Sequence, residues 1–593
     1  MRGSAVFCLA LVFVAACGSA TTEERASALP TATATRLTTR TPTPTATQTP
    51  TPTATAPAAV VSGDLRESLL SDAVRQSGAP CGFVDVLDFP LDAPHGAMAS
   101  GGGDFGRFRD RFDGFHTGED WRDGASSFGK PVYSIGHGRV TYAQPNGWGA
   151  DKGVVIVQHT FRDGRRILSF YGHLDPPSVK IRAGQCTERG DLVGAIGDPR
   201  SPPHLHFEIR VHLPETPGPG YWSVDPSRSG WRPPSATIWN ERAAALPGVN
   251  WTHLSNSEQL HVLGTIDSRV LVSSENGEVM ALDVDDGRTS WVHDLSDTTS
   301  NVLLDALGGL VYVSSAGGKV DAYGVSALED RNVILPVEPV WSTELDSPST
   351  YDLVSLPQGG LVAYSRSSME AISESGEPLW SEELVSGVTD WAQTGEALVF
   401  LIRNEIWRAD EQGATQMIGP INGQSVVASE QPFVYSEDGI YQIDMELGSV
   451  ELFFGLPSGF PRSGSLSEIL GGGILVAHTD LDDKRLIAVY EDGLLRWERS
   501  IASLGARAAE LLTLNNEMYL MTQYDIGRST GIDLFQIDTE SGDLTRIFSG
   551  GTRSTSSNPG EIAAVGDSLL IHIAGVGLAA VDPQAALEAV QGE

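Results

Sequence analysis

The sequence predicts an all-β chain with two folded domains, the second of them a β-propeller. Between residues 60 and 240, short apolar runs such as KPVYSIGHGRVTYA and GVVIVQHTF are broken by glycine, and no long amphipathic helix pattern interrupts them. This pattern is typical of strands in antiparallel sheets. From residue 245 to 593 the chain resembles itself at intervals of about 42 residues, which indicates repeated units of several strands. A length of 593 residues is itself too great for one domain.

Charge is distributed unevenly between the two parts. The whole chain carries a net charge of −36, but residues 1–240 hold 23 acidic and 23 basic side chains, whereas residues 241–593 hold 53 and 17. The excess therefore belongs to the second part and argues against nucleic acid as its partner. An acidic surface that serves only solubility explains the excess as well as a site for a cation or a basic partner does.

The first residues have the pattern of an export signal. Arg2 precedes the apolar run AVFCLALVFVAA, which is too short to span a bilayer and ends at Val14-Ala15-Ala16-Cys17. Small residues before a cysteine resemble the lipobox of bacterial lipoproteins. The resemblance implies that residues 1–16 are a signal peptide and that Cys17 is lipidated, in preference to a plain secretory signal. We therefore expect an exported protein, lipid-anchored to a membrane that faces the cell envelope or the cell exterior.

Residues 17–59 are predicted to be a disordered tether. Their core, PTATATRLTTRTPTPTATQTPTPTATAP, is rich in threonine and proline and cannot form a packed core. Proline favours extended polyproline II backbone, so we expect a semi-rigid spacer.

Two cysteines remain in the chain once the signal peptide and the lipidated residue are set aside. These are Cys81 and Cys186. Outside the cytoplasm a disulfide between them would persist, although the sequence alone leaves open whether they meet.

A pair of histidines in the first domain indicates a metal site. In PPHLHFEIR, His204 and His206 are two residues apart, and such residues on a strand project from the same face. Two imidazoles side by side fit a hydrophobic core poorly because their nitrogens need polar partners. They suit a cation such as zinc, which binds imidazole nitrogen and carboxylate oxygen.

The surrounding motifs resemble those of the lysostaphin/LytM-type zinc metallopeptidases, which cleave peptidoglycan peptides. His116-Thr117-Gly118-Glu119-Asp120, Tyr171-Gly172-His173-Leu174 and His204-Leu205-His206 occur in the family's order. The match extends over roughly residues 105–212 within a predicted domain of residues 60–240. The resemblance implies that His116, Asp120 and His206 bind Zn²⁺, and that His173 and His204 are catalytic residues acting on water and the transition state.

Several neighbouring residues are not assigned to the site. We expect Glu119 to face solvent because its neighbours face the metal, and we expect His137, His159 and His212 to be ordinary surface or strand histidines. The approach to the last motif, GDPRSPPHLH, is richer in proline than is usual in the family, which puts the shape of the substrate groove in doubt. Because all five motif positions are kept, an active enzyme is favoured over the relatives that lost their ligands and regulate other wall enzymes.

The repeats of residues 245–593 resemble the pyrroloquinoline-quinone-type repeat of BamB-like propellers. Segments such as GEVMALDVDDGRTSWVHDL and IDLFQIDTESGDLTRIF show it, and turn glycines Gly287 and Gly542 lie six repeats apart. We expect seven or eight blades. Four tryptophans are interpreted as packing between blades: Trp291, Trp341, Trp380 and Trp497. A quinoprotein dehydrogenase is disfavoured because this part contains no cysteine and is strongly acidic.

Together these features predict an exported zinc endopeptidase that acts on peptidoglycan peptides, with a propeller that binds a protein or wall partner and no nucleic acid. The alternatives are a non-catalytic scaffold lipoprotein that binds the cell wall or activates hydrolases, and a scaffold in which the propeller is the main functional part.

Overall fold

The computed structural model describes residues 79–592 apart from short segments. The segments left out are residues 124–125, 212–216, 256, 276, 296–298, 307, 330–336, 396, 404, 419–422, 428–431, 437, 457–464, 470–472, 480–483, 491 and 554–559. The predicted signal peptide, the lipidation site Cys17, the tether and His212 lie outside the described residues. Within the described part of the chain, none of the helices combines the length and the apolar character needed to cross a membrane.

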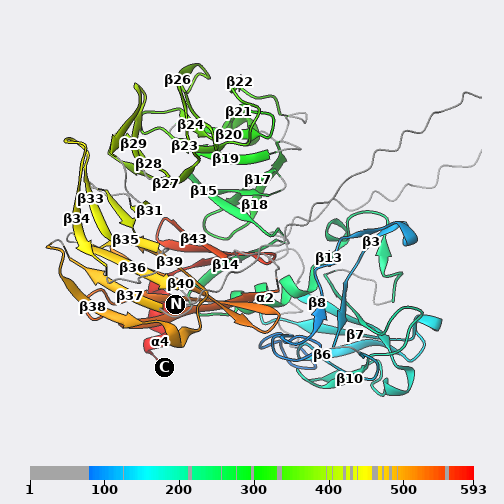
Figure 1. Cartoon of the computed structure of the whole chain (residues 1–593). Coiled ribbons are helices and arrows are strands. Elements are labelled where there is room, and N and C mark those ends of the chain that lie inside the picture. Colours follow the sequence, from blue (N-terminus) through cyan, green and yellow to red (C-terminus); the bar gives the residue numbers. More distant parts are fainter. Residues whose placement is uncertain are drawn as a thin grey trace, which may run out of the picture. The chain divides into compact units, whose positions relative to one another are not determined.

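The first domain is built on an eight-stranded antiparallel sheet in which β1, β4, β11, β8, β7, β6 and β9 lie side by side and β13 pairs with β11 (Figure 1). Two small sheets, β10-β5 and β12-β3-β2, flank it. The strands are β1 (Ser100–Gly101), β2 (Phe108–Arg109), β3 (Gly114–His116), β4 (Glu119–Arg122), β5 (Pro131–Tyr133), β6 (Gly138–Gln144), β7 (Gly153–Thr160), β8 (Arg166–Leu174), β9 (Cys186–Thr187), β10 (Leu192–Ala195), β11 (Leu205–Arg210), β12 (Tyr221–Trp222) and β13 (Trp231–Arg232). Short 3-10 helices are η2 (Asp110–Phe112), η3 (Gly149–Asp151), η4 (Pro176–Ser178) and η5 (Pro226–Ser229).

Strand β11 lies between β4 and β8 and is buried along its whole length. Its apolar residues Leu205, Phe207 and Ile209 enter the hydrophobic core. Because side chains alternate along a strand, His206, Glu208 and Arg210 all point to the opposite face. Strand β11 therefore presents a row of polar side chains on one face, while the apolar row on its other face packs in the core.

Strand β4 shows the same alternation, and here one expectation from the sequence is wrong. Glu119 does not face solvent: it is 2% exposed and accepts hydrogen bonds from Trp121 Nε1 (2.9 Å) and from Ser235 N and Oγ (3.2 and 2.5 Å). It does point away from Asp120, as alternation requires. The far side of β4 is covered, however, by helix α2 (Pro234–Ala244), which the apolar pattern did not reveal. The N–H and O–H groups of Ser235 satisfy the buried carboxylate.

A disulfide joins Cys81 to Cys186, with an S–S distance of 1.99 Å. It fixes the start of the described chain to β9, at the edge of the large sheet. The pairing that the sequence left open is therefore present in the structure.

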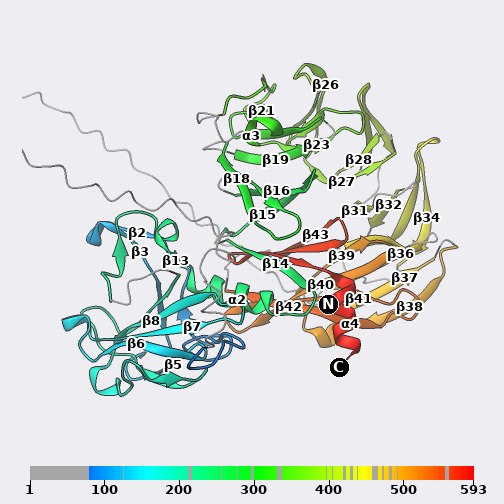
Figure 2. The same cartoon turned by 180° about the vertical axis from the view of Figure 1, so that it is seen from behind.

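The second domain contains eight four-stranded antiparallel sheets within the described residues (Figures 1 and 2). The first strands of most neighbouring sheets contact one another, and β15 also contacts β43, which joins the first sheet to the last. The eighth sheet, β43-β44-β45-β14, takes its outermost strand from the beginning of the domain. The structure is an eight-bladed propeller in which β14 links the first and last blades.

The strands of the propeller are β14 (Val249–Leu254), β15 (Leu260–Ile266), β16 (Arg269–Ser274), β17 (Glu278–Asp283), β18 (Thr289–Asp294), β19 (Thr299–Asp305), β20 (Leu310–Ser315), β21 (Lys319–Gly324), β22 (Trp341–Glu344), β23 (Asp352–Ser355), β24 (Leu361–Tyr364), β25 (Ser368–Ile372), β26 (Pro378–Glu383), β27 (Val388–Thr394), β28 (Ala397–Ile402), β29 (Glu405–Asp410), β30 (Gly413–Ile418), β31 (Gly423–Val427), β32 (Phe433–Ser436), β33 (Gly439–Asp444), β34 (Ser449–Gly455), β35 (Ser465–Ile469), β36 (Gly473–Thr479), β37 (Lys484–Val489), β38 (Leu495–Ser500), β39 (Ala508–Leu514), β40 (Glu517–Ile526), β41 (Ser529–Ile537), β42 (Leu544–Thr552), β43 (Gly560–Val565), β44 (Ser568–Ile573) and β45 (Gly577–Val581). Its helical segments are α3 (Val325–Glu329), η6 (Ala502–Leu504) and α4 (Pro583–Gln591).

A repeated tryptophan contact joins neighbouring blades. Trp341, Trp380 and Trp497 lie on outermost strands, and each donates its indole N–H to a carbonyl oxygen in the last turn of the next blade, at 2.8, 2.8 and 2.9 Å. Trp251 on β14 makes the same bond to Val284 O at 2.7 Å. These tryptophans therefore pack between blades, and the ring-closing strand uses the same contact as the others.

Trp291 is the exception among the four tryptophans singled out in the sequence. Its buried Nε1 has no hydrogen-bond partner within the described residues. The next blade lacks the short turn found elsewhere, because α3 lies between β21 and β22 in the chain (Figure 2). Trp291 packs instead in an apolar cluster with Val325 and Leu328 of α3.

Candidate metal centre

All five polar positions of the three sequence motifs meet at one place in the first domain. His116 ends β3, Asp120 lies on β4 and His206 lies on β11, where its Cα pairs with those of Asp120 and Gly172. His204 precedes β11, and His173 follows Gly172 on β8. The sheet register therefore brings together residues that are up to 90 positions apart in sequence.

Gly118 allows the loop between β3 and β4 to approach β11. A Cβ atom at this position would lie 2.5 Å from Phe207 O and 3.0 Å from His206 Nε2. No side chain fits in that space, which explains the glycine within the His-Thr-Gly-Glu-Asp segment.

Three ligand atoms converge on one point. His116 Nε2 lies 3.0 Å from His206 Nδ1 and 3.4 Å from Asp120 Oδ1, and His206 Nδ1 lies 3.3 Å from the same oxygen. Zinc bonds of about 2.0–2.1 Å in a tetrahedron place ligand atoms about 3.3–3.4 Å apart. The group fits a tetrahedral cation with one position left open.

The outer nitrogens of the two imidazoles have acceptors of their own. His116 Nδ1 lies 3.2 Å from both the carbonyl and a carboxylate oxygen of Asp104, and His206 Nε2 lies 2.9 Å from Glu208 Oε1. Because oxygen atoms accept there, the outer nitrogens carry hydrogen, which leaves the lone pairs of the inner nitrogens for a metal. Carboxylates in this position are typical partners of metal-binding histidines.

Glu208 is itself held firmly. Its fully buried carboxylate accepts hydrogen bonds from Thr117 Oγ1 (2.7 Å), Arg210 Nε (2.5 Å) and Trp231 Nε1 (2.8 Å). Burial raises the pKa of this carboxyl, but the charge of Arg210 and the bond to His206 outweigh burial and bring the pKa to about 2. Glu208 is therefore ionised when it accepts from His206.

The surrounding carboxylates favour positive charge at the convergence point. Burial alone would lower the pKa of His116, but Asp104 and Asp120 raise it to about 10. The pKa of His206 is also raised, against burial, by Asp120 and Glu208. Burial would raise the pKa of Asp120, yet hydrogen bonds from His116, His204 and His206 hold it far below its usual range. A divalent cation would satisfy the same electrostatic demand.

His173 and His204 flank the three ligand residues without joining them. Their Nδ1 atoms lie 2.8 Å from Asp151 O and 2.7 Å from Pro202 O, so each donates to a backbone carbonyl. In the neutral form this leaves the Nε2 lone pair of each ring for the cleft. Burial, with the nearby charges of His206 and His204, lowers the pKa of His173 to about 4, so it is a neutral base at pH 7.

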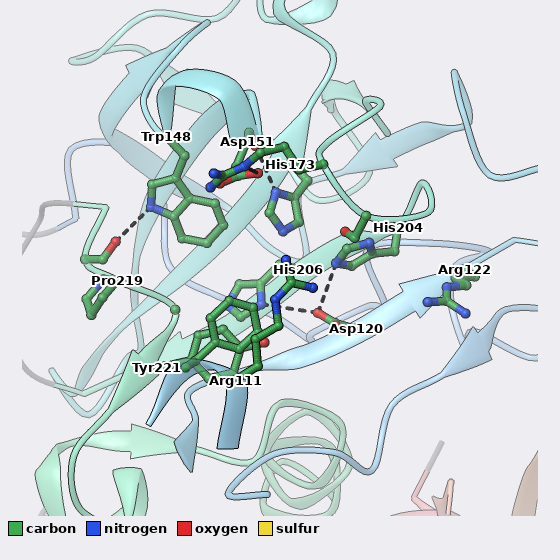
Figure 3. Close-up of a pocket in the computed structure, with 15 residues that line it drawn as sticks. Arg111, Asp120, Arg122, Trp148, Asp151, His173, His204, His206, Pro219 and Tyr221 are labelled. Atoms are coloured by element: carbon green, nitrogen blue, oxygen red, sulfur yellow. Dashed lines mark hydrogen bonds and ion pairs between the residues drawn. The ribbon is translucent and has the colours of Figure 1, made fainter. Parts of the chain in front are cut away.

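Four of the five residues, all except the buried His116, line a cleft of about 500 Å³. Figure 3 shows Trp148 and His173 on one side, Tyr221 on another, and His204, His206 and Asp120 between them. Trp148 donates its indole N–H to Gly218 O at 2.8 Å, and its ring lies 5.0 Å from that of His173. Aromatic and arginine side chains therefore surround Asp120 and His206 in this cleft.

Some residues of the site escaped the sequence analysis. Glu208 could have been found, because it follows His206 by two residues and shares its face. Asp104 and Trp148 come from loops whose positions no local pattern reveals. His137 is a partly exposed surface residue, whereas His159 is fully buried on β7. Neither reaches the cleft.

Comparison with known proteins agrees with this division of the chain. Residues 114–219 match the profile of the family described as Peptidase family M23, and residues 248–450 match that of the outer membrane protein assembly factor BamB. The predicted resemblances to a LytM-type peptidase and to a BamB-like propeller are thereby confirmed. No curated protein matches the chain.

Three of the similar solved structures each align with 56% of this chain. The computationally designed protein Ika8 is 12% identical and covers 56% of this chain and 99% of its own, with a TM-score of 0.43. BamB from Moraxella catarrhalis is 13% identical and covers 56% and 97%, with a TM-score of 0.39. Sqt1 of Saccharomyces cerevisiae is 10% identical and covers 56% and 98%, with a TM-score of 0.41.

Proposed function

We propose that the chain is an exported, lipid-anchored zinc endopeptidase that hydrolyses amide bonds in peptidoglycan peptides, and that its propeller binds a protein or wall partner. The observation that carries the proposal is the convergence of His116 Nε2, Asp120 Oδ1 and His206 Nδ1 at the spacing of zinc ligands, beside two further histidines. The match to a peptidase family over the same residues supports the reaction type.

His116, Asp120 and His206 would hold the zinc ion, and the two remaining histidines would handle protons. A zinc ion at such a site polarises a carbonyl and lowers the pKa of a bound water towards neutrality. His173, neutral at pH 7 with Nε2 towards the cleft, is suited to accept a proton from water and return it to the leaving amine. His204, whose Nε2 lies 3.4 Å from Asp120 Oδ1, is placed in its protonated form to donate from Nε2 to the oxygen on which charge develops.

The remaining parts of the chain have supporting roles in this proposal. Cys17, at the end of residues 1–16, carries the lipid, and residues 17–59 form the tether. Residues 60–240 would then work at a distance from the membrane, and residues 245–593 would select where they work. Replacing Cys17 by serine should prevent incorporation of a labelled fatty acid.

The test is digestion of purified peptidoglycan by the zinc-loaded full chain, with and without a chelator, followed by mass spectrometry of the released fragments. We expect cut peptides that disappear with the chelator and return when zinc is added back. A His206→Ala variant prepared in parallel controls for contaminating hydrolases.

Absence of release from several wall types, with zinc confirmed in the protein, would contradict catalysis. It would favour the alternative of a non-catalytic scaffold lipoprotein that binds the wall or activates another hydrolase. Deletion of residues 245–593 without loss of localisation or phenotype would contradict the role given to the propeller.

A further inference from the structure

The cleft is lined by arginines that have no part in the proposed metal site. Three arginines line it, Arg111, Arg122 and Arg200, together with two carboxylates, Asp120 and Asp151. Residues 1–240, which contain the cleft, hold 23 acidic and 23 basic side chains, so a cleft with more arginines than carboxylates departs from the charge balance of this part of the chain. The partners of these groups decide whether the positive charge is available to a ligand.

Both carboxylates of the cleft are already engaged. Asp151 receives two hydrogen bonds from the guanidinium of Arg200, one of them 2.9 Å long, so these two charges compensate each other. Asp120 lies 3.3–3.4 Å from nitrogens of three histidines. Neither carboxylate is left to neutralise the other two arginines.

Arg122 points into the cleft from the strand that carries a metal ligand. It follows Asp120 by two residues on β4, so it shares the face of Asp120 at a distance of about 7 Å along the strand. Within the described residues its guanidinium has no carboxylate partner. The next carboxylate in sequence, that of Asp123, pairs with Lys130 at 3.3 Å.

Arg111 lies on the other side of the ligand cluster, in η2. Its neighbour Phe112 stacks on Tyr221 with ring centres 4.1 Å apart, and Tyr221 in turn lies 5.2 Å from the ring of His116. The guanidinium lies 5.3 Å from the ring of Phe112, and no carboxylate in the described part of the chain pairs with it. Asp104, the nearby acid of the ligand network, pairs with Arg109 instead.

Figure 3 shows this arrangement directly: Arg111 lies beside Tyr221, Arg122 lies beyond Asp120, and the ligand residues His206 and Asp120 are between them. We propose that Arg111 and Arg122 each bind a carboxylate of the substrate, so that the cleft selects peptides with acidic groups on both sides of the bond that is cut. Guanidinium groups bind carboxylates with two parallel hydrogen bonds, which position as well as attract. The inference rests on the proposed peptidase function and specifies its substrate as an anionic peptide.

The experiment compares cross-linked peptides released from cell wall before and after their carboxylates are converted to amides with carbodiimide and ammonia. The zinc-loaded full chain should cleave the untreated peptides with the higher kcat/KM, through KM rather than kcat. Arg111→Gln and Arg122→Gln should each reduce this preference about fivefold to thirtyfold, and the double variant should abolish it. Arg122→Lys should keep part of the preference because it keeps the charge.

Arg182→Gln is the matched control, because Arg182 is an exposed arginine of the same domain that does not line the cleft. Equal cleavage of free and amidated peptides by the unaltered chain would overturn the inference while leaving the peptidase function standing. A loss of preference in Arg182→Gln as large as in the cleft variants would also overturn it.

Failure of the proposed function itself would look different, because neither peptide would be cut. Binding of the same peptides, labelled with a fluorophore and measured by anisotropy, then decides the inference independently. Tighter binding of the anionic form that weakens in Arg111→Gln and Arg122→Gln supports it, and equal binding of both forms overturns it.

Discussion

Individual side chains around the ligand cluster take their roles from the alternation of β-strands. On β11, His206 and Glu208 face the site while Phe207 enters the core; on β4, Asp120 faces the site while Glu119 faces α2. Both glutamates are buried and both lie within two residues of a candidate metal ligand, but only Glu208 contacts one.

Removing a ligand and removing its neighbour should have different results. We expect His206→Ala to abolish tight zinc binding and cleavage, because one of three converging atoms is lost. His204→Ala should keep zinc and lose turnover, because its Nε2 lies near Asp120 but does not belong to the group of atoms from His116, Asp120 and His206 that lie within 4.8 Å of one another. Metal analysis after dialysis, together with peptidoglycan digestion, distinguishes the two. If His204→Ala lost the metal as completely as His206→Ala, the division of roles would be wrong.

The two buried glutamates provide a second comparison. Glu208→Gln should weaken zinc binding about 10- to 100-fold, because a neutral amide supports the basicity of His206 less well than a carboxylate. Glu119→Gln should leave zinc affinity near that of the unaltered chain, because its partners are Trp121 and Ser235. Competition with a fluorescent zinc chelator gives both affinities. Equal losses of zinc affinity in the two variants would show that affinity depends on the burial of a carboxylate and not on its hydrogen bond to His206.

A buried histidine remote from the cleft should make the first domain sensitive to acid. Burial lowers the pKa of His159 to about 4, whereas an unfolded histidine has a pKa of about 6.5. The unfolded state therefore binds more protons between these values, and stability is lost as pH falls from about 6.5 to about 4, by roughly 3 kcal/mol in total.

Thermal unfolding of the zinc-free chain at several pH values measures this loss. His159→Gln should flatten the decline on the acid side, and His137→Gln, which replaces a partly exposed histidine of the same domain, is the control. An identical decline in all three proteins would assign the acid sensitivity to other groups.

At the scale of elements, the propeller is assembled by one contact repeated between blades. The indole of Trp497 bonds to Thr539 O and lies over Gly542, where a Cβ atom would come within 2.7 Å of the ring. Gly287 and Gly376 stand in the same relation to Trp251 and Trp341. The turn glycines that revealed the repeat in the sequence are therefore required both by their positive φ and by the tryptophan above them.

A comparison of two glycines distinguishes the need for positive φ from the need for space beside the indole. Gly542 and Gly566 both have positive φ, +76° and +56°, but nothing lies within 4 Å of a Cβ built at Gly566. Gly566→Ala should destabilise the chain by about 1–2 kcal/mol through backbone strain alone. Gly542→Ala should cost about 1–3 kcal/mol more, because the indole must move. Thermal unfolding of both variants tests this, and equal shifts would mean that the tryptophan contact adds nothing.

The elements also show what the sequence could and could not predict. The candidate metal ligands could be predicted because they lie in three short sequence motifs that resemble those of a known family. The blades could be predicted because similar turns recur at a regular interval. The sequence predicts seven or eight blades, and the structure has eight. The last sheet is hard to count from the repeats because β14 and β43–β45 come from opposite ends of the domain. Helix α2 and the burial of Glu119 depend on packing between distant segments, which no local pattern records.

At the scale of the whole molecule, the two domains share a hydrophobic core. One cluster of buried residues includes Trp121 and Phe207 of the first domain, Trp239 of α2, and Phe548 and Ile571 of the propeller. Arg553, directly after β42, donates hydrogen bonds to Gly96 O, to Ala99 O (2.8 Å) and to Gly101 O (3.2 Å). The propeller therefore contacts the backbone that pairs with β4, the strand of Asp120.

Removing the side chain of Arg553, a residue of the second domain, should therefore loosen part of the first domain. The guanidinium of Arg553 also lies 4.4 Å from the centre of the Trp121 ring, next to Asp120 in sequence. In Arg553→Ala the carbonyls of residues 96–101 lose a charged donor, so local opening should become easier by about 2–4 kcal/mol. Hydrogen–deuterium exchange should therefore accelerate in residues 96–103 and 119–122. Arg546→Ala is the control, because that side chain is 60% exposed and its one ion pair within the described residues is with Asp533, at 3.5 Å. Unchanged exchange in Arg553→Ala would mean that β4, the strand of Asp120, is stable without the contact to the propeller. Faster exchange in Arg553→Ala but not in Arg546→Ala would mean that the propeller stabilises the strand that carries part of the candidate site.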